Sequence, residues 1–172
     1  MYTKRWIVLS ALSVAVSGCA AQSVPIPSTK SSGYRGPKVT RVVVMKDRRR
    51  LYLLNGKNVL RQYNIGLGFA PEGDKKVRGD GKTPEGHYII NRRNPNSRYY
   101  LSLGISYPNA RDIAEARALG RDPGGDIFIH GRPKEYSDGG RDWTWGCIAV
   151  TDRHMREIYA MVETGTPISI YR

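Results

Sequence analysis

Two short segments of the chain each place a reactive side chain beside a glycine. One covers residues 127–131 (IFIHG) and the other residues 142–150 (DWTWGCIAV). A cysteine must become a thiolate before it attacks a carbonyl carbon, and a histidine within hydrogen-bonding reach can take the proton and hold a positive charge beside the sulfur. Cys147 and His130 are therefore a candidate nucleophile and base.

The spacing of these two residues permits the pairing without requiring it. They lie 17 positions apart (147 − 130), so two neighbouring strands joined by the Gly- and Asp-rich loop of residues 131–142 would bring them together. Gly146 lets the backbone turn sharply before the nucleophile. The N–H groups around Gly146 and Cys147 are placed to bind a developing oxyanion, which is often a large part of catalysis.

The other histidines do not predict a metal site. The three histidines show no HExxH or HxxxH spacing, whereas a metal hydrolase uses about three protein ligands in a compact arrangement. His87 and His154 are interpreted as structural or exposed, and neither a metal nor a cofactor is expected. The run at residues 81–83 (GKT) mimics the end of a P-loop, but Lys76 stands where that motif requires its first glycine.

The N-terminal residues are typical of an export signal. Lys4 and Arg5 precede an apolar stretch over residues 6–16 and a small-residue cleavage site at residues 16–19 (VSGC). The stretch is shorter than the roughly 20 residues of a membrane-spanning helix. The VSGC run resembles the lipobox of bacterial lipoproteins, which implies removal of residues 1–18 and lipidation of Cys19.

Lipidation of Cys19 would hold the protein at a membrane, because two or more acyl chains anchor stably where one anchors marginally. Ala20, not Asp, follows the cysteine, and in Gram-negative lipoproteins this implies transfer to the outer membrane. We expect a lipoprotein of the cell envelope, on the periplasmic face of a membrane. A lipidated Cys19 also leaves Cys147 without a disulfide partner, which favours a reactive thiol over an inert buried one.

Residues 19–38 are rich in Ser, Pro, Gly and Ala and show no hydrophobic period, so they are interpreted as a flexible tether. The chain has room for one further domain, over residues 39–172. Its net charge of +13 falls to +11 when Lys4 and Arg5 are removed with the leader. Such a charge suits an anionic partner, and export favours a carboxylate-rich envelope polymer over nucleic acid.

Short β-prone runs separated by turn signals dominate the predicted domain. Strands are predicted over residues 42–44, 51–54, 59–65, 86–91, 101–106, 126–130, 147–150 and 167–171. The pairing begins as antiparallel, and Asn55-Gly56 predicts a hairpin with a type I′ turn.

Two helices interrupt these strands. The first is predicted from about Ala110 to Leu119, with Asn109 as N-cap and Gly120 as the stop. The second follows Thr151 and ends near Gly165, with an apolar stripe at 155, 158, 159 and 162. Many strands and few helices predict a mainly β domain with peripheral helices (α+β), a sandwich or barrel.

The motif residues resemble a known family. His130-Gly131, followed after a loop by residues 144–147 (TWGC), is similar to the catalytic signature of L,D-transpeptidases of the YkuD fold. Residues 79–88 (GDGKTPEGHY) resemble the family's second recognisable segment. The resemblance spans residues 39–172 and implies a YkuD-like β-sandwich catalytic domain.

The resemblance implies a cysteine acyltransferase acting on the bond after the third, diamino-acid residue of a peptidoglycan stem peptide. Cys147 would form a thioester, and His130, oriented by the Gly131 carbonyl, would deprotonate it and later activate the acceptor. Thr144 and Gly146 would orient the site and support the oxyanion. An amine acceptor would give a crosslink or attach a lipoprotein, and water would give hydrolysis.

Two positions, Trp145 and Ala149, depart from the family's common pattern. The Asp-Trp-Thr-x-Gly-Cys-Ile-Ala-Val form resembles a Gram-negative subgroup, some of whose members cleave peptidoglycan–lipoprotein links. The direction of reaction therefore stays open. Trp145, Arg132 and Arg141 are candidates for substrate contact.

The predicted partners are peptidoglycan stem peptides, a membrane through the lipid anchor, and a murein-attached lipoprotein. Two alternatives remain. One is a purely hydrolytic L,D-endopeptidase or amidase with the same pair of residues. The other is a murein-binding lipoprotein without catalysis, against which the presence of both His130 and Cys147 argues.

Overall fold

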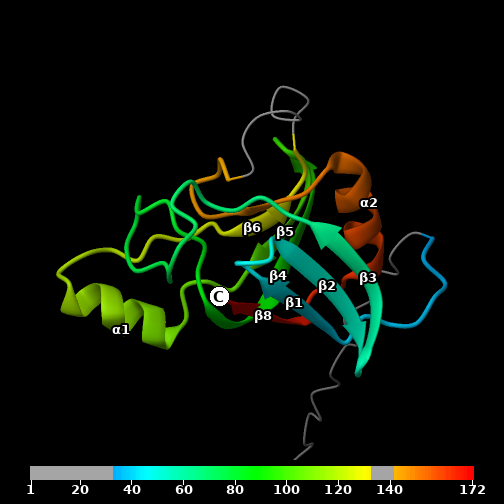
Figure 1. The fold of residues 1–172 in the computed structure, drawn as a ribbon, viewed down its shortest axis with the longest axis horizontal. Helices are drawn as coiled ribbons and strands as arrows, with labels where there is room; N and C mark the ends of the chain where they lie inside the picture. Colours follow the sequence, from blue (N-terminus) through cyan, green and yellow to red (C-terminus); the bar gives the residue numbers. More distant parts are fainter. Residues whose placement is uncertain (1–32, 133–141) are drawn as a thin grey trace, which may run out of the picture.

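The computed structural model of the chain describes residues 33–132 and 142–172 (Figure 1). Cys19, the predicted leader and Arg141 lie outside these residues. Within the two described ranges, eight strands and two helices follow one another as β1 Arg41–Met45, β2 Arg50–Asn55, β3 Asn58–Asn64, β4 Gly86–Ser97, β5 Tyr100–Ile105, α1 Ala110–Ala118, β6 Phe128–His130, β7 Ile148–Ala149, α2 Asp152–Met161 and β8 Pro167–Tyr171.

The strands form one mixed sheet in the order β3-β2-β1-β8-β4-β5-β6-β7. β1, β2 and β3 are antiparallel neighbours, as predicted, and β8 runs parallel to β1 and antiparallel to β4. The short strands β6 and β7 are parallel. The predicted fold class, mainly β with two helices, is confirmed.

The long strand β4 carries the sheet around a corner. Its residues 86–89 pair with β8, and its residues 90–97 pair with β5. Past β3, the bridges Gly66↔Ala149 and Gly68↔Thr144 join the segment 66–68 to β7 and to the turn before it. The two ends of the strand order therefore meet, and the sheet curls as strands that switch between sheet layers do.

Local signals explain the first hairpin and show one error. β2 ends at Asn55 and β3 begins at Asn58, so the central turn residues are Gly56 and Lys57. Of these two, Gly56 has a positive φ, 57°. The hairpin is confirmed, but the predicted type I′ turn is wrong, because glycine at the first central position fits type II′.

Both helices begin where they were predicted to begin, after Asn109 and after Thr151. Asn109 accepts hydrogen bonds from the backbone of Arg111 and Asp112 and forms a capping box with Asp112, and the Thr151 side chain accepts from the backbone of His154.

No helix within residues 33–132 and 142–172 is long and apolar enough to cross a membrane.

The predicted end of the second helix, near Gly165, is wrong. α2 ends at Met161, and the C-cap Val162 is extended, with φ −101° and ψ 122°. The Arg93 guanidinium of β4 donates a hydrogen bond to the Val162 carbonyl. The end of this helix is therefore stabilised by a side chain from β4, which is distant in sequence.

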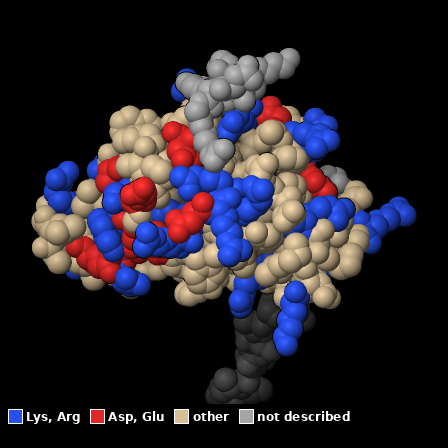
Figure 2. Space-filling view, viewed as in Figure 1, with Lys and Arg blue, Asp and Glu red and all other residues tan. Residues whose placement is uncertain are grey.

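Basic side chains cover much of the visible surface, in keeping with the net charge of +13 (Figure 2). Acidic side chains gather on the side of α1, where Lys76 pairs with both Asp74 and Glu115. The charges are therefore mixed around α1 and more uniformly basic elsewhere on this face.

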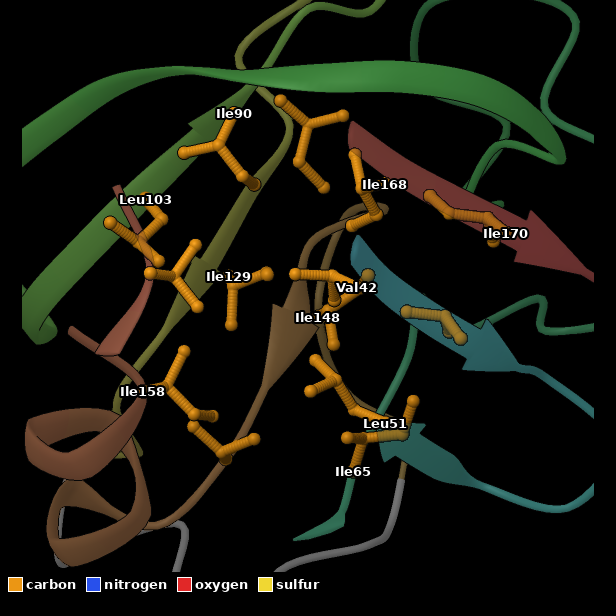
Figure 3. Close-up of a cluster of buried hydrophobic side chains, with 14 of the residues drawn as sticks. Val42, Leu51, Ile65, Ile90, Leu103, Ile129, Ile148, Ile158, Ile168 and Ile170 are labelled. Atoms are coloured by element: carbon orange, nitrogen blue, oxygen red, sulfur yellow. The ribbon is translucent and has the colours of Figure 1, made fainter. Parts of the chain in front are cut away.

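The core lies inside the curled sheet and is closed by α2 (Figure 3). β1 buries alternate residues, Val42 and Val44, as half-buried strands do. β8, between β1 and β4, buries three residues in a row, Ile168 to Ile170. Ile158 of α2 lies in the same cluster as Leu103, Ile129 and Ile148. One face of β5, β6 and β7 is thus committed to the core, which leaves the other face for a site.

Candidate active site

The pairing of β6 with β7 decides where the two predicted reactive residues lie. Ile129 is opposite Ile148, and His130 is opposite Ala149. Because side chains alternate between the faces of a sheet, Ile129 and Ile148 enter the core, whereas His130 and Cys147 share the opposite face. The two side chains therefore project from neighbouring strands on one face of the sheet.

The imidazole of His130 is buried and held in one tautomer. Its Nδ1 lies 2.6 Å from the carbonyl oxygen of Gly131. A carbonyl oxygen only accepts, so Nδ1 carries the proton and Nε2 has the free lone pair. The Tyr99 ring stacks on the imidazole at a centroid distance of 4.7 Å, and the Trp143 ring meets it at 5.7 Å.

Burial sets the charge state of both groups. Burial lowers the pKa of His130. Burial also raises the pKa of Cys147 to about 11, although a backbone hydrogen bond from Phe128 acts in the opposite direction. The Cys147 Sγ donates to the backbone carbonyl of Asp126 at 3.5 Å. At neutral pH the pair is therefore a protonated thiol and a neutral imidazole, arranged for base-assisted attack and not as a preformed ion pair.

The turn before Cys147 is fixed by Thr144. The Thr144 hydroxyl donates to the Cys147 carbonyl at 2.7 Å and accepts from the Gly146 N–H at 3.2 Å. The Thr144 backbone N–H donates to the Leu67 carbonyl at 3.1 Å, and its carbonyl accepts from Phe69 at 2.9 Å. Thr144 thus closes the turn and ties it to the segment after β3.

Glycine is required on both sides of the pair. Gly146 has φ 127°, and a Cβ there would lie 2.6 Å from the Lys82 carbonyl oxygen. A Cβ on Gly131 would lie 2.7 Å from the Tyr99 carbonyl oxygen and would also meet the Asp152 carboxylate. Any side chain at either position would displace the backbone that carries Cys147 or His130.

The predicted substrate-contact residues lie in different surroundings. Trp145 is 71% exposed, and its ring meets that of Phe69 edge to face at 4.9 Å, so the two make an apolar surface close in sequence to Cys147. Arg132 is half-buried. Burial is the main cause of the lowered pKa of His130, and the positive charge of Arg132 lowers this pKa further. Arg141 lies outside the described residues.

Three contacts of the site were not predicted, namely those of Tyr99, Asp126 and Phe128. Asp126 has φ 57°, and the Gly124-Gly125 pair directly before it is a turn signal that could have singled it out. Tyr99 has no such signal, because it reaches His130 from the turn between β4 and β5. In the described part of the chain no group of three His, Cys, Asp or Glu side chains could hold a metal ion.

Comparison with known proteins shows the family of the chain. The family profile of the YkuD L,D-transpeptidase catalytic domain matches residues 39–170. YafK of Escherichia coli K12 is 30% identical over 151 residues, which cover 84% of this chain and 55% of YafK.

Solved structures agree as well. The helical cell shape determining protein Pgp2 of Campylobacter jejuni superimposes with a TM-score of 0.60 at 29% identity, over 85% of this chain and 52% of Pgp2. An L,D-transpeptidase of Mycobacterium smegmatis, at 16% identity and a TM-score of 0.54 over 80% of this chain and 60% of that one, shares the fold.

The chain spans about half the length of YafK and of Pgp2. The family profile nevertheless covers most of the chain, including both glycine-flanked motifs. The chain therefore belongs to the YkuD family of L,D-transpeptidase catalytic domains.

Proposed function

We propose that the protein is a cysteine acyltransferase of the bacterial cell wall that forms a thioester on Cys147 with the third, diamino-acid residue of a peptidoglycan stem peptide. The observation that carries this proposal is the shared face of Cys147 and His130, set by the β6–β7 register. The Gly131 carbonyl, 2.6 Å from Nδ1, leaves Nε2 of His130 to act as the base.

The first half-reaction balances with these two side chains. The Cys147 Sγ attacks the carbonyl carbon of the third residue while its proton passes to Nε2 of His130. The imidazolium then protonates the amino group of the fourth residue as the C–N bond breaks. That residue leaves, and the acyl group remains on sulfur.

The second half-reaction uses the same base for either acceptor. An amine or a water molecule attacks the thioester, gives its proton to Nε2, and the returning thiol takes that proton. An amine gives a crosslink or attaches a lipoprotein, and water gives hydrolysis, including the release of a bound lipoprotein. One acyl-enzyme thus serves all of these reactions.

The oxyanion of each tetrahedral intermediate needs a backbone donor. The Gly146 N–H already donates to the Thr144 hydroxyl, so we assign Gly146 and Thr144 to positioning the turn and the Cys147 N–H to the oxyanion. Trp145, with Phe69, and Arg132 are assigned to contact with the peptide, as is Arg141.

The cellular setting is part of the same proposal. Lipidation of Cys19 would anchor the protein at the periplasmic face of the outer membrane, and residues 19–38 would let the domain reach the murein. The net charge of +11 that is left when Lys4 and Arg5 are removed from the +13 of the full chain suits a carboxylate-rich polymer. Pgp2, described as determining helical cell shape, supports a role in cell-wall architecture.

The test is turnover of a defined peptide. Synthetic tetrapeptide stems are incubated with the protein, and mass spectrometry follows release of the fourth residue and formation of dimers or tripeptides. We expect release by the wild type and none by Cys147→Ser. Release that survives in Cys147→Ser, or folded wild type with a reduced thiol that binds murein and releases nothing, would contradict the proposal.

A further inference from the structure

A row of paired residues leads from the nucleophile to an arginine three strands away. Arg92 of β4 is opposite Gly104 of β5, and Gly104 is opposite Phe128 of β6. Extending the β6–β7 register by one residue sets Cys147 beside Phe128. Residues paired across strands share a face, so Arg92 stands on the same face as the thiol.

A bulge in β4 and a glycine in β5 determine where the Arg92 side chain lies. Ile90 pairs with Ile105 and Arg92 with Gly104, so Asn91 is an extra residue in β4, and such bulges re-aim side chains next to active sites. A Cβ on Gly104 would lie 2.8 Å from Asn91 Oδ1 and 3.2 Å from the Arg92 Cβ. Because Gly104 has no side chain, the side chains of Asn91 and Arg92 can occupy the space above it.

The Arg92 side chain ends one strand away from the nucleophile. Its guanidinium lies over the Phe128 ring, 4.8 Å from the centroid, and neighbouring strands are about 4.8 Å apart. Arg92 also pairs with Asp126 at 3.3 Å, and the two side chains are 58% and 87% exposed. Asp126 is the residue whose carbonyl accepts the Cys147 thiol.

Arg92 and Asp126 border a hollow of about 280 Å³, whose lining is completed by Asn91, Ile105, Tyr107 and Ile127. An ion pair so exposed contributes little to folding stability. Both charges are therefore available to a ligand without loss of a buried interaction.

We propose that Arg92 and Asp126, with Asn91 beside them, bind an α-amino acid group, that is, an ammonium and a carboxylate on one carbon. This rests on the proposed function, because the group would be the free end of the diamino acid whose carbonyl Cys147 attacks. A guanidinium fits a carboxylate in bidentate geometry, and the Asp126 carboxylate takes the ammonium. The site thus selects a diamino acid with a side-chain carboxylate over one with an ammonium alone.

The experiment measures binding apart from catalysis. Two tetrapeptide stems that differ only at the third residue, diaminopimelate or lysine, are titrated calorimetrically into the Cys147→Ala protein and into the same protein with Arg92→Gln, Asp126→Asn or Arg78→Gln added. Arg78 is the matched control, because it forms a comparably exposed pair with Asp122, at 2.9 Å and with exposures of 69% and 59%. Circular dichroism checks that each variant is folded.

We expect the diaminopimelate stem to bind roughly tenfold to a hundredfold more tightly than the lysine stem. Arg92→Gln should abolish this difference, Arg78→Gln should keep it, and Asp126→Asn should weaken both peptides, since both carry the ammonium. Asn tolerates a left-handed backbone, so the turn at Asp126 is retained.

Equal affinity for the two stems, binding of neither, or a preference that survives Arg92→Gln would overturn the proposal. The binding site and the proposed function can be tested independently. If the preference depends on Arg92 but the wild type releases no fourth residue, the binding site stands and the acyltransferase does not.

Discussion

The pKa values of His130 and Cys147 are shifted in opposite directions by the same cause, burial. Burial lowers the pKa of His130 and raises that of Cys147, so each group is driven toward its uncharged form. In the proposed mechanism, proton transfer must then accompany attack on the substrate, because the thiolate is scarce at neutral pH. This makes Nε2 of His130 the group on which the rate depends.

The pH dependence of acylation follows from this. His130 acts as a base when neutral, and since its pKa is lowered from 6.5, we expect the rate to hold from neutral pH down to 6.5 and to decline only below it. His130→Gln should cost about 10²- to 10⁴-fold, measured by stopped-flow acylation. His154→Gln is the control, because His154 lies on α2. A decline that begins above 6.5, or an unimpaired His130→Gln, would contradict this role.

The same depressed pKa has a consequence for stability. The unfolded chain binds a proton at His130 near pH 6.5 and the folded chain only at lower pH, so folding loses stability as pH falls below 6.5. Urea unfolding should show a smaller loss over this range in His130→Gln than in the wild type. An identical loss in both proteins would show that His130 is not buried as a neutral group.

At the scale of elements, the turn before β7 is held from two sides. The segment after β3 bonds to Thr144, and the Lys82 carbonyl closes over Gly146. Cys147, the proposed nucleophile, is thus placed by contacts between segments far apart in the sequence. Substitution at Gly146 therefore tests the placement.

Gly146→Ala should lower the free energy of unfolding by about 1–3 kcal/mol and slow acylation, because φ is 127° and a Cβ would lie 2.6 Å from the Lys82 carbonyl oxygen. Gly165→Ala is the matched control, with φ 86° and nothing within 4 Å of its Cβ. It should be destabilised through φ alone and acylate normally. Equal behaviour of the two variants, by urea unfolding and acylation rate, would contradict the account.

Local signals predicted most elements, whereas pairing over long distances was not predictable. The cap at Asn109, the start of α2 after Thr151 and the hairpin after Asn55 depend on neighbours in sequence, and the structure has them. The end of α2 depends on Arg93 of another strand. The parallel pairing of β8 with β1 depends on which strands share a core, and no local pattern reports that.

The candidate site divides in the same way. The chemistry of Cys147 and His130 could be predicted from residue type and adjacent glycines. The alignment of Arg92 with Cys147 could not, because it depends on a bulge in β4 and on the register of three strand pairs. Sequence reasoning therefore proposed the reactive pair and missed what surrounds it.

Across the whole molecule, a buried lysine fixes the segment that backs the site. The Lys46 ammonium, at the end of β1, donates to the Gly73 carbonyl at 2.5 Å, the Thr83 carbonyl at 2.9 Å and Glu85 Oε1 at 2.8 Å. Its side chain is 2% exposed. This one charge connects the first strand to the segment that includes Lys82.

Lys46→Met should lower the free energy of unfolding by about 3–5 kcal/mol, because it leaves the Glu85 carboxylate and two carbonyls unpaired. Lys57→Met, in the exposed turn between β2 and β3, should stay within about 0.5 kcal/mol of the wild type. Urea unfolding measures both. A Lys46→Met protein as stable as Lys57→Met would show that the buried charge does not hold this segment.

The most direct test of the central claim, acylation of Cys147, is the intact mass of the protein after exposure to a carbapenem. Thiol attack opens the β-lactam ring with no leaving group, so the adduct has the full mass of the drug. We predict one equivalent, located on the peptide that contains Cys147 and absent from Cys147→Ala. Folded protein with a reduced thiol that forms no adduct, or an adduct that persists in Cys147→Ala, would contradict the account.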